Sequence, residues 1–514
     1  MLLAELIEGL PVSVVHGDPA LVRVSDITED SRTVLPGAMF VARAGLTADG
    51  TRFIADAVRA GAAVILTERP ETCPDGVAVV ACDEAPLCMA LCAERLFGNP
   101  SGRLLVAGVT GTNGKSTVAH LVHGLMNRVG VRCGMIGTVL IDDGSESAPS
   151  PMTTPPAIEL SRTLATMVDA GCEAAVMEVS SHALDQRRAD AIAFDAGIFT
   201  NITGDHADYH KTFEAYLTAK RRLLGLLRGD APGILNADDA VVAASAEAVA
   251  SGRPVLCREL VGGVAADADW TFERISRSIE GESLAIRTAG HEIRATVPLI
   301  GGFNAMNVCQ AVAAAWWLLD RAGMDKPERA SRIGQALSLA TAPTGRVEPV
   351  HGAGDDVRVF VDFAHTDDAL DRVLSAVRAV SEPGSELTVV FGCGGDRDTE
   401  KRPRMGAVAA ANADRIVLTS DNPRSEPPST IIDAILPGIP KERRGGTLVH
   451  TAREIAIREA ILGAAAGGVV VIAGKGHETD QVSRNSSGRL VSRRFVDQEY
   501  ARAALADRRA GVTA

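Results

Sequence analysis

The sequence predicts an α/β fold in three domains. The chain has 514 residues, and at about 150 residues per domain this length suggests three domains. Short runs rich in Val, Ile and Leu alternate with Ala-rich stretches of helical character, which is typical of parallel strands covered by helices on both faces. These runs occupy 104–109, 174–179, 357–363, 386–392, 415–420 and 467–474.

Two segments containing Gly and Pro mark the predicted domain boundaries. GNPSGRLL (98–105) precedes the first strong apolar run, and LATAPTGRVEP (339–349) follows an Ala-rich helix expected over 305–320. We therefore expect a smaller N-terminal α/β domain, a central parallel sheet and a Rossmann-like C-terminal α/β domain, over residues 1–100, 101–340 and 341–514.

Composition narrows the class of protein. Lys and Arg number 52 against 65 Asp and Glu, for a net charge of −13, which argues against general nucleic-acid binding. Nine cysteines without a CxxC pair indicate reduced thiols rather than a disulfide framework or zinc site. The N-terminus lacks a basic segment typical of signal peptides, and the apolar run 461–474 is shorter than the roughly 20 residues that span a bilayer. We expect a cytoplasmic protein without a membrane span.

A glycine-rich loop follows the apolar run 104–109. In TGTNGKST, Lys115 can reach terminal phosphates and Ser116 can bind magnesium, while a helix expected from Ser116 onward favours anions at its N-terminus. Glycines stand at 108, 111 and 114, and Val109 occupies the usual first glycine position. A structural turn before a helix is the alternative; the Lys-Ser pair favours a P-loop-type nucleotide site. The loop residues predicted to bind ATP are Gly111, Thr112, Asn113, Gly114, Lys115, Ser116 and Thr117.

Further motifs follow this loop in a fixed order. They are TTPP (153–156), MEVSSHALDQRR (177–188), TNITGDHADYH (200–210), YLTAK (216–220), GGFNAMN (301–307), GRVE (345–348), VDFAHT (361–366), FGCGGDRD (391–398), DNPR (421–424) and GKGHE (474–478). With EDSRTVLPGAMFVARAG (29–45), the set resembles the Mur ligase family of peptidoglycan synthesis over nearly the whole chain. The resemblance implies an ATP-dependent amide ligase that adds meso-diaminopimelate to UDP-MurNAc-L-Ala-D-Glu through an acyl phosphate, as a step in cell-wall biogenesis.

The resemblance also implies a magnesium-dependent catalytic set. It comprises Lys115, Glu178, His206, Lys220 and Arg346. Mg2+ would be held by Ser116, Glu178, His206 and Lys220, the last modified to N6-carboxylysine, since magnesium prefers hard oxygen ligands. The alternatives are a strand-end surface carboxylate for Glu178, a salt-bridged helix lysine for Lys220 and an interdomain salt bridge for Arg346.

Two further ligand sets follow from the same resemblance. ATP would also contact Asn304, Asn307, Arg346, Asp362 and His365. UDP-MurNAc-dipeptide would contact Ser31, Arg32, Thr153, Thr154, Ser180, Gln186 and Arg188, although Thr153 and Thr154 could equally form a polar turn before Pro155. The chain departs from the family pattern at Thr51, Gly204, Phe363 and Asp367.

The C-terminal motifs bear on the amino acid that is added. A second carboxylate on the substrate needs a guanidinium, and Arg424 of DNPR supplies one, whereas Glu478 suits a distal ammonium. The predicted diaminopimelate site is Arg397, Asp421, Asn422, Pro423, Arg424, Gly474 and Glu478. The alternative for the DNPR segment is an Asp-Asn-Pro turn with a solvated arginine. The alternatives for the function of the whole chain are a lysine-adding or D-Ala-D-Ala-adding ligase, a folylpolyglutamate synthetase, and a catalytically silent ATP-binding regulator.

We expect the protein to be a monomer.

Overall fold

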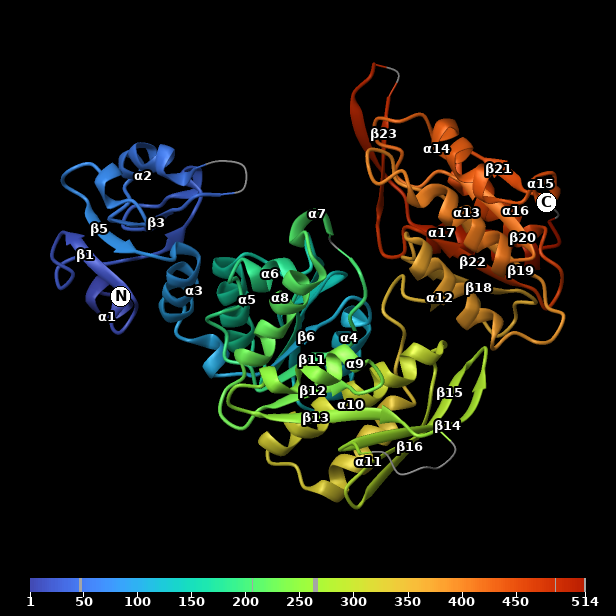
Figure 1. Cartoon of the computed structure of the whole chain (residues 1–514), viewed down its shortest axis with the longest axis horizontal. Coiled ribbons are helices and arrows are strands. Elements are labelled where there is room, and N and C mark those ends of the chain that lie inside the picture. The colour runs from blue at the N-terminus through green and yellow to red at the C-terminus, as the bar shows by residue number, and fades with distance from the viewer. Residues whose placement is uncertain (46–48, 206, 262–266, 486, 513–514) are drawn as a thin grey trace. The chain divides into compact units, whose positions relative to one another are not determined.

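The chain divides into two compact units. The computed structural model describes residues 1–45, 49–205, 207–261, 267–485 and 487–512 (Figure 1). Unit 1 comprises Met1–Phe272, Ile286–Ile293 and Met306–Ala336, and unit 2 comprises Glu273–Ala285, Arg294–Ala305 and Leu337–Ala514. Unit 1 therefore contains the first predicted domain and most of the second, and the domain boundaries near residues 100 and 340 remain predictions.

The first hundred residues of unit 1 build a small sheet. Its strands are β1 (Val12–His16), β2 (Ile27–Thr28), β3 (Met39–Ala42), β4 (Val64–Thr67) and β5 (Ala78–Cys82). They lie in the order β1-β5-β4-β3-β2, and only the β1–β5 pair among them is antiparallel. Helices α1 (Leu3–Ile7) and α3 (Ala85–Leu96) pack on one face of this sheet, and their core also includes Ile158.

A larger sheet begins with the run that precedes the glycine-rich loop. Its strands are β6 (Leu105–Thr110), β7 (Cys133–Ile136), β8 (Leu140–Asp142), β9 (Ser147–Pro149), β10 (Ala174–Glu178), β11 (Ala196–Phe199), β12 (Pro232–Asn236), β13 (Arg253–Glu259), β14 (Trp270–Ser278), β15 (Gly281–Thr288) and β16 (His291–Val297). The order is β16-β15-β14-β13-β12-β11-β6-β10-β7-β8-β9. Because β6 pairs in parallel with both β10 and β11, the carboxyl ends of these three strands share one edge, where α/β sheets bind ligands.

The centre of this sheet explains one glycine of the loop motif. Gly108 lies in β6, and a Cβ there would come within 2.7 Å of the Phe194 ring and 2.8 Å of the Leu223 side chain. A larger residue would push away α8 (Phe213–Gly225), the helix that carries Leu223. Gly108 therefore serves close packing between the sheet and this helix.

Unit 2 contains a second mostly parallel sheet. Its strands are β17 (Glu348–Pro349), β18 (Arg358–Asp362), β19 (Leu387–Phe391), β20 (Arg415–Thr419), β21 (Leu448–His450) and β22 (Val469–Ala473). They lie in the order β17-β18-β22-β19-β20-β21. The hairpin of β23 (Asp480–Arg484) and β24 (Leu490–Arg494) forms a separate sheet.

Both faces of the unit 2 sheet are buried, as the continuous apolar runs predict. Phe360, Val389 and Val471 point to the face covered by α12 (Asp367–Arg378), α13 (Lys401–Asn412) and α14 (Pro428–Ile435). Val359, Val390 and Val470 point to the opposite face, which α16 (Arg453–Leu462) and α17 (Asp497–Arg509) cover.

The six predicted runs are confirmed as β6, β10, β18, β19, β20 and β22, each within two residues of the expected bounds. The Ala-rich helix is α10 (Gly302–Arg321), and the loop helix is α4 (Lys115–Arg128). The α/β class is confirmed. Sequence patterns did not predict α11 (Lys326–Leu337) or strands β14 to β16, because the latter mix polar and apolar residues without a continuous apolar run.

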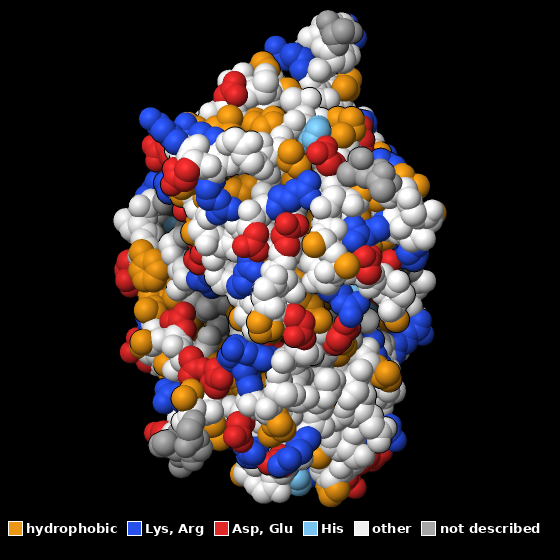
Figure 2. Space-filling view, turned by 90° about the vertical axis from the view of Figure 1, so that its right-hand side faces the viewer, with side chains coloured by type: hydrophobic (Ala, Val, Ile, Leu, Met, Phe, Trp, Pro, Cys, Tyr) orange, Lys and Arg blue, Asp and Glu red, His pale blue; other side chains and the backbone are white. Residues whose placement is uncertain are grey.

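The charged surface and the polarity of the helices both bear on the class of protein. Acidic and basic side chains are interspersed over the face seen in Figure 2. Within the described ranges, every helix is too short or too polar to traverse a bilayer.

Candidate active site

The glycine-rich loop joins β6 to α4 with its backbone in conformations that favour glycine. Gly111 has φ +146° and Gly114 has φ +88°. A Cβ on Gly111 would lie 1.9 Å from Thr200 Oγ1, and one on Gly114 would lie 2.7 Å from Asn307 Oδ1. Lys115 Nζ donates hydrogen bonds of 3.0 Å to the carbonyl oxygens of Gly111 and Thr112. The loop backbone therefore curls around the Lys115 ammonium. The loop amides directly precede the N-terminus of α4, as phosphate binding requires.

Glu178 closes the side of the loop from the end of β10. Its side chain is buried, with 2% exposed. Oε2 accepts hydrogen bonds from Ser116 Oγ at 3.0 Å and from Thr138 Oγ1 at 3.0 Å, and Oε1 accepts from the Thr138 amide at 2.7 Å. The strand register places Glu178 beside Val109 at the carboxyl end of β6. The sheet edge therefore holds a carboxylate and a loop hydroxyl in direct contact.

Three residues predicted to contact the uridine nucleotide gather beside Glu178. Thr154 Oγ1 donates to the Glu178 carbonyl at 2.9 Å and accepts from the Ser180 amide at 3.0 Å. Thr153 Oγ1 lies 3.1 Å from Thr138 Oγ1. The TTPP segment is thus fastened to the end of β10.

Lys220 reaches the same loop from α8. Its side chain is 2% exposed, and Nζ donates a 2.6 Å hydrogen bond to the Gly111 carbonyl and lies 4.5 Å from the centre of the Tyr216 ring. Burial lowers the pKa of Lys220 well below its usual value, the neighbouring Lys115 ammonium lowers it further, and Asp205 opposes both effects. Two lysines meeting at one carbonyl therefore favour an uncharged amine on Lys220.

A small cavity lies next to this edge. It has a volume of about 60 Å³ and is lined by Glu29, Arg43, Pro86, Met89, Pro156, Ala157, Gln186 and Arg188. Arg188 donates to the Thr154 carbonyl at 2.8 Å and to Gln186 Oε1 at 2.7 Å. Arg43 pairs with Glu29 at 2.6 Å across the cavity wall. Gln186 and Arg188 are thus brought together with Glu29, Arg43, Pro86 and Met89 of the first hundred residues, and their role in binding a nucleotide sugar stays a prediction.

Ser31 and Arg32 do not line that cavity. The Arg32 side chain is 87% exposed and pairs with Asp30 at 2.7 Å, which caps the short turn Ser31–Thr33. Their predicted role remains a prediction.

In unit 2, the turn that carries Arg346 is fastened to the end of β18. Asp362 Oδ2 accepts from the Val347 amide at 2.7 Å, and burial raises the pKa of Asp362, against the lowering effect of Arg346. Gly345 has φ +68°, and a Cβ there would lie 2.2 Å from the Gly476 carbonyl carbon. The Arg346 guanidinium lies 4.8 Å from the centre of the Phe363 ring.

Two histidines flank Phe363. The ring of His365 lies 4.6 Å and that of His477 lies 4.8 Å from the Phe363 ring, measured between centroids. Burial lowers the pKa of His365 and lowers that of His477 to about 4. Both imidazoles are therefore neutral at pH 7, and Arg346 is the charged group of this aromatic cluster.

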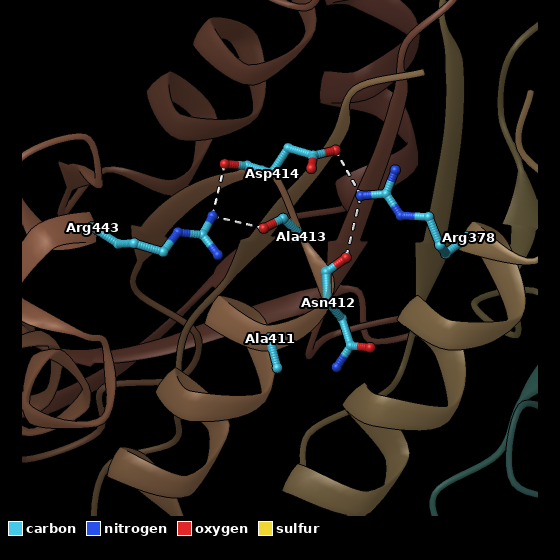
Figure 3. A pocket seen from close by; sticks show the side chains of 6 residues that line it. All are labelled: Arg378, Ala411, Asn412, Ala413, Asp414 and Arg443. Atoms are coloured by element: carbon cyan, nitrogen blue, oxygen red, sulfur yellow. Dashed lines mark hydrogen bonds and ion pairs between the residues drawn. The ribbon is translucent and has the colours of Figure 1, made fainter. Parts of the chain in front are cut away.

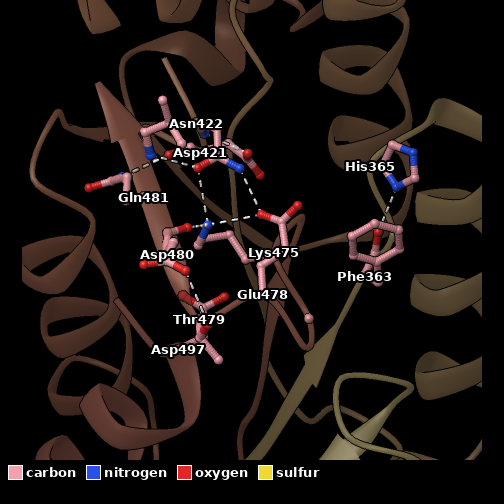
Figure 4. A network of polar contacts seen from close by, with 12 residues as sticks. Phe363, His365, Asp421, Asn422, Lys475, Glu478, Thr479, Asp480, Gln481 and Asp497 are labelled. Carbon is pink, nitrogen blue, oxygen red and sulfur yellow. Dashed lines mark hydrogen bonds and ion pairs between the residues drawn. The ribbon is translucent and has the colours of Figure 1, made fainter. Parts of the chain in front are cut away.

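The DNPR loop follows β20 and faces the GKGHE segment (Figure 4). Asn422 Nδ2 donates a 2.7 Å hydrogen bond to Glu478 Oε2. Lys475 Nζ donates to the same oxygen at 3.0 Å and to Asn422 Oδ1 at 3.3 Å. Gly474 has φ +115°, and a Cβ there would lie 2.5 Å from Asp421 Oδ2. Asn422 of DNPR and Glu478 of GKGHE are thus hydrogen-bonded to each other and to Lys475, and Gly474 lies against Asp421.

Arg424 occupies a strained position at the rim of this cluster. It has φ +50°, a conformation that non-glycine residues adopt rarely. Its amide donates to the Val482 carbonyl at 2.9 Å, and its Nη1 donates to the Gly395 carbonyl at 2.8 Å. The guanidinium is half-buried, whereas Arg397 on the neighbouring loop is exposed.

The remaining predicted residues have separate positions. Asn304 and Asn307 lie one turn apart on α10, with Asn307 against Gly114. His206 lies outside the described residues, so its predicted role stays a prediction. Among the residues that are described, His, Cys, Asp and Glu side chains form no group of three suited to a metal ion.

Two residues of the site were missed by sequence reasoning. Thr138 follows β7 and makes two hydrogen bonds to Glu178; its signal is a polar residue just after a buried strand. Lys475 is fully buried under Glu478, although it stands within the GKGHE motif.

A larger cavity lies elsewhere in unit 2 (Figure 3). It measures about 460 Å³ and is lined by Arg378, Ala411, Asn412, Ala413, Asp414 and Arg443. Arg378 pairs with Asp414 at 2.6 Å, and Arg443 donates to the Ala413 and Asp414 carbonyls at 2.7 and 2.8 Å. Because Asp414 precedes β20, this cavity is at the amino end of the strand whose carboxyl end leads to DNPR.

The fold and the loop define the class of protein: an α/β nucleotide-binding protein of the P-loop type, with a carboxylate poised at the loop serine. Family comparisons agree with this class. Residues 109–315 match the Mur ligase middle domain, 345–476 match the glutamate ligase domain of Mur ligases, and 23–93 match the Mur ligase family catalytic domain.

The chain belongs to the Mur ligase family. It is 40% identical to a protein from Chlorobium phaeobacteroides, over 99% of this chain and 98% of that one, and 36% identical to one from Clostridioides difficile, over 98% and 99%. Both are named UDP-N-acetylmuramoyl-L-alanyl-D-glutamate–2,6-diaminopimelate ligase.

Solved structures show the same fold. A structure of a ligase with that name has a TM-score of 0.70 and 28% identity over 99% of each chain. The MurF ligase from Thermotoga maritima in complex with ADP has a TM-score of 0.59 and 17% identity, over 95% of this chain and 99% of that one.

Proposed function

We propose that this chain is an ATP-dependent ligase that adds meso-diaminopimelate to UDP-MurNAc-L-Ala-D-Glu in peptidoglycan precursor synthesis. The observation that carries the proposal is its 36–40% identity, over nearly its full length, to relatives named for this reaction. The glycine-rich loop, the buried Glu178 and the DNPR–GKGHE cluster support it with chemistry suited to the reaction.

The reaction needs a carboxylate oxygen converted into a leaving group. The γ-phosphoryl group of ATP would bond to one of the two free carboxylates of the D-Glu residue as its bond to ADP breaks. The diaminopimelate amine would then attack the acyl carbon, expelling phosphate and losing a proton. Catalysis of such a transfer is mostly positioning and charge stabilisation. Lys115, the loop amides and Arg346 would stabilise the transferred charge.

Magnesium would be held at the carboxyl edge of the large sheet. Glu178 and Ser116 fit it, because they present hard oxygen atoms 3.0 Å apart at the mouth of a phosphate loop. His206 and a carbamate on Lys220 complete the proposed set. The ion would supply positive charge to the phosphate oxygens and the reacting carboxylate.

The carbamate proposal for Lys220 has a physical basis in this chain. Only an uncharged amine can attack carbon dioxide, forming an N–C bond and releasing one proton. Burial and the Lys115 ammonium both favour the uncharged form of Lys220. The product would be an anion beside Lys115, which offsets the cost of burying it.

For the nucleotide substrate, we propose the surface around Gln186 and Arg188, whose cavity of about 60 Å³ has room for only a small part of the substrate. Thr153, Thr154 and Ser180 would add hydroxyl and amide contacts toward Glu178. Arg188 would pair with a carboxylate of the dipeptide in place of its present hydrogen bonds to Gln186 and the Thr154 carbonyl. Ser31 and Arg32 are proposed for the uridine end.

For the incoming amino acid, we propose the cluster at the carboxyl ends of β20 and β22. Arg424 would bind the distal carboxylate and Glu478 the distal ammonium of meso-diaminopimelate, with Asn422 between them. Asp421, Pro423, Gly474 and Arg397 would shape the rest of the site. Asn304, Asn307, Asp362 and His365 are proposed for ATP.

The test is ADP release by the purified full chain. With ATP, Mg2+ and UDP-MurNAc-L-Ala-D-Glu, we expect turnover with meso-diaminopimelate and little with L-lysine or with no amino acid. Turnover with lysine alone would make the chain a lysine-adding ligase. Nucleotide binding without turnover under every condition would favour a silent regulator.

The remaining expectations are a cytoplasmic location and a monomer. All three substrates are soluble small molecules, which suits a cytoplasmic enzyme. A monomer should sediment with a mass near 53.6 kDa, and analytical ultracentrifugation tests this directly.

A further inference from the structure

A buried ammonium lies beneath the DNPR–GKGHE cluster. The Lys475 side chain has no exposed surface. Its Nζ donates to Glu478 Oε2 at 3.0 Å, to Asn422 Oδ1 at 3.3 Å and to the Asp480 carbonyl at 2.5 Å (Figure 4). An ammonium has three donors, so these acceptors saturate it. Lys475 therefore acts through its neighbours and does not itself reach a ligand.

Those neighbours are the residues proposed to receive the distal end of the amino acid. The Glu478 side chain is 35% exposed, so its carboxylate meets Lys475 on one side and solvent on the other. Asn422 Nδ2 donates to the same carboxylate oxygen at 2.7 Å. The amide of Asn422 is held in one orientation, since its Oδ1 also accepts from the Val482 amide at 3.0 Å.

The charged side chains of the DNPR and GKGHE segments sum to zero because of Lys475; Arg397, on the neighbouring loop, is outside this sum because it is exposed and water screens its charge. Asp421 and Glu478 are acidic, and Arg424 and Lys475 are basic. The nearby pairs Arg453–Asp497, at 2.7 Å, and Arg402–Glu426, at 2.8 Å, are each internally neutral. Without Lys475, the same cluster would carry one net negative charge.

This balance matches one amino acid better than another. The distal end of meso-diaminopimelate carries an ammonium and a carboxylate, with zero net charge, whereas that of lysine carries a single ammonium. A neutral but polarised pocket suits the zwitterion, and a pocket with a surplus negative charge suits the lone cation.

We propose that Lys475 is a specificity-determining positioning residue of this ligase. Its buried charge offsets Glu478 and orients Asn422, so that the pocket prefers an amino acid with a zwitterionic distal end over one with a single distal ammonium. The inference rests on the proposed function and goes beyond it, because it assigns the discrimination to a residue that does not touch the substrate.

The test compares two amino acids in full-length variants. Lys475→Met removes the charge and keeps most of the side-chain volume; Lys475→Gln keeps a hydrogen-bond donor as well. For both, we expect the ratio of kcat/KM for meso-diaminopimelate to that for L-lysine to fall about tenfold or more, with the KM for ATP unchanged. Lys441→Met, at an exposed position of the same unit, makes the same change in net charge and should leave the ratio unaltered.

A double variant keeps the test decisive if removal of Lys475 alone weakens folding. Lys475→Met with Glu478→Gln restores zero net charge and leaves no unpaired charge beside Asn422, so the ratio should rise above that of Lys475→Met. Equal losses for the two amino acids, a parallel rise in the KM for ATP, or no recovery in the double variant would overturn the role of Lys475. Absence of wild-type turnover with meso-diaminopimelate would instead refute the proposed function on which the inference rests.

Discussion

Ser116 Oγ lies 3.0 Å from Glu178 Oε2, so a hydroxyl of the phosphate loop and a carboxylate 62 residues away meet at one point. The contact exists because β6 and β10 are adjacent parallel strands that end at the same edge. Thr138, after the next strand, holds the other side of the carboxylate. Three consecutive strands of the sheet thus combine to place one negative charge beside the loop.

Replacing Glu178 with Gln should abolish most of the activity. The change keeps the shape of the side chain and removes the charge proposed to bind Mg2+, so we expect a loss of about 100-fold or more in kcat, the usual cost of losing one electrostatic partner of the transition state. ADP release at a series of Mg2+ concentrations measures it. Glu159→Gln, at an exposed position on α5 (Ala157–Asp169), is the matched control. Activity within twofold of wild type would remove Glu178 from the metal site.

Removing carbon dioxide should inactivate the enzyme reversibly. The pKa of Lys220 is lowered by burial and by Lys115, so its amine is uncharged at pH values where an exposed lysine, with a pKa near 10.4, is protonated. Carbamate formation should therefore persist at pH values well below those that an exposed lysine would need, and should fail as the pH falls through the lowered pKa. Activity after degassing, with and without added bicarbonate, measures this.

The Lys220→Ala variant provides the complementary test. It should be inactive with bicarbonate, and a short carboxylic acid such as acetate should restore part of its activity by replacing the missing oxygen ligand. Full activity of Lys220→Ala without any additive would contradict the carbamate proposal.

Replacing Arg424 with Ala should cripple the use of meso-diaminopimelate. Truncating one partner of a charged pair costs about 2–5 kcal/mol, so we expect kcat/KM for the amino acid to fall about 100-fold while ATP affinity is retained. Steady-state kinetics with each substrate varied separates the two effects. Arg489→Ala, exposed on the turn of the β23–β24 hairpin, should behave as wild type. A loss of ATP affinity in Arg424→Ala would show that Arg424 has been assigned to the wrong ligand.

Asp497→Asn should destabilise unit 2. Arg453 and Asp497 are both fully buried and share two hydrogen bonds of 2.7 Å. Removing the Asp497 charge leaves the Arg453 guanidinium buried without an ionic partner, which lowers the free energy of unfolding by about 3–5 kcal/mol. Calorimetry should therefore show a clearly lower transition temperature for this unit. Asp507→Asn, which breaks the exposed pair with Arg458, should cost less than about 1 kcal/mol. Similar shifts for both variants would contradict this account.

The amino-acid sequence by itself determined the elements and the motifs. Continuous apolar runs predicted six parallel strands, and the Lys115-Ser116 pair after glycines predicted the phosphate loop, because periodicity and spacing are properties of short windows. The tertiary structure decided which of these motifs touch. Lys220 reaches Gly111 across 109 residues, and Lys475 reaches Asn422 across 53. Such contacts depend on strand order and on burial, and neither strand order nor burial can be obtained from a local sequence pattern. The same two factors determine the charge state of Lys220 and the charge balance around Glu478.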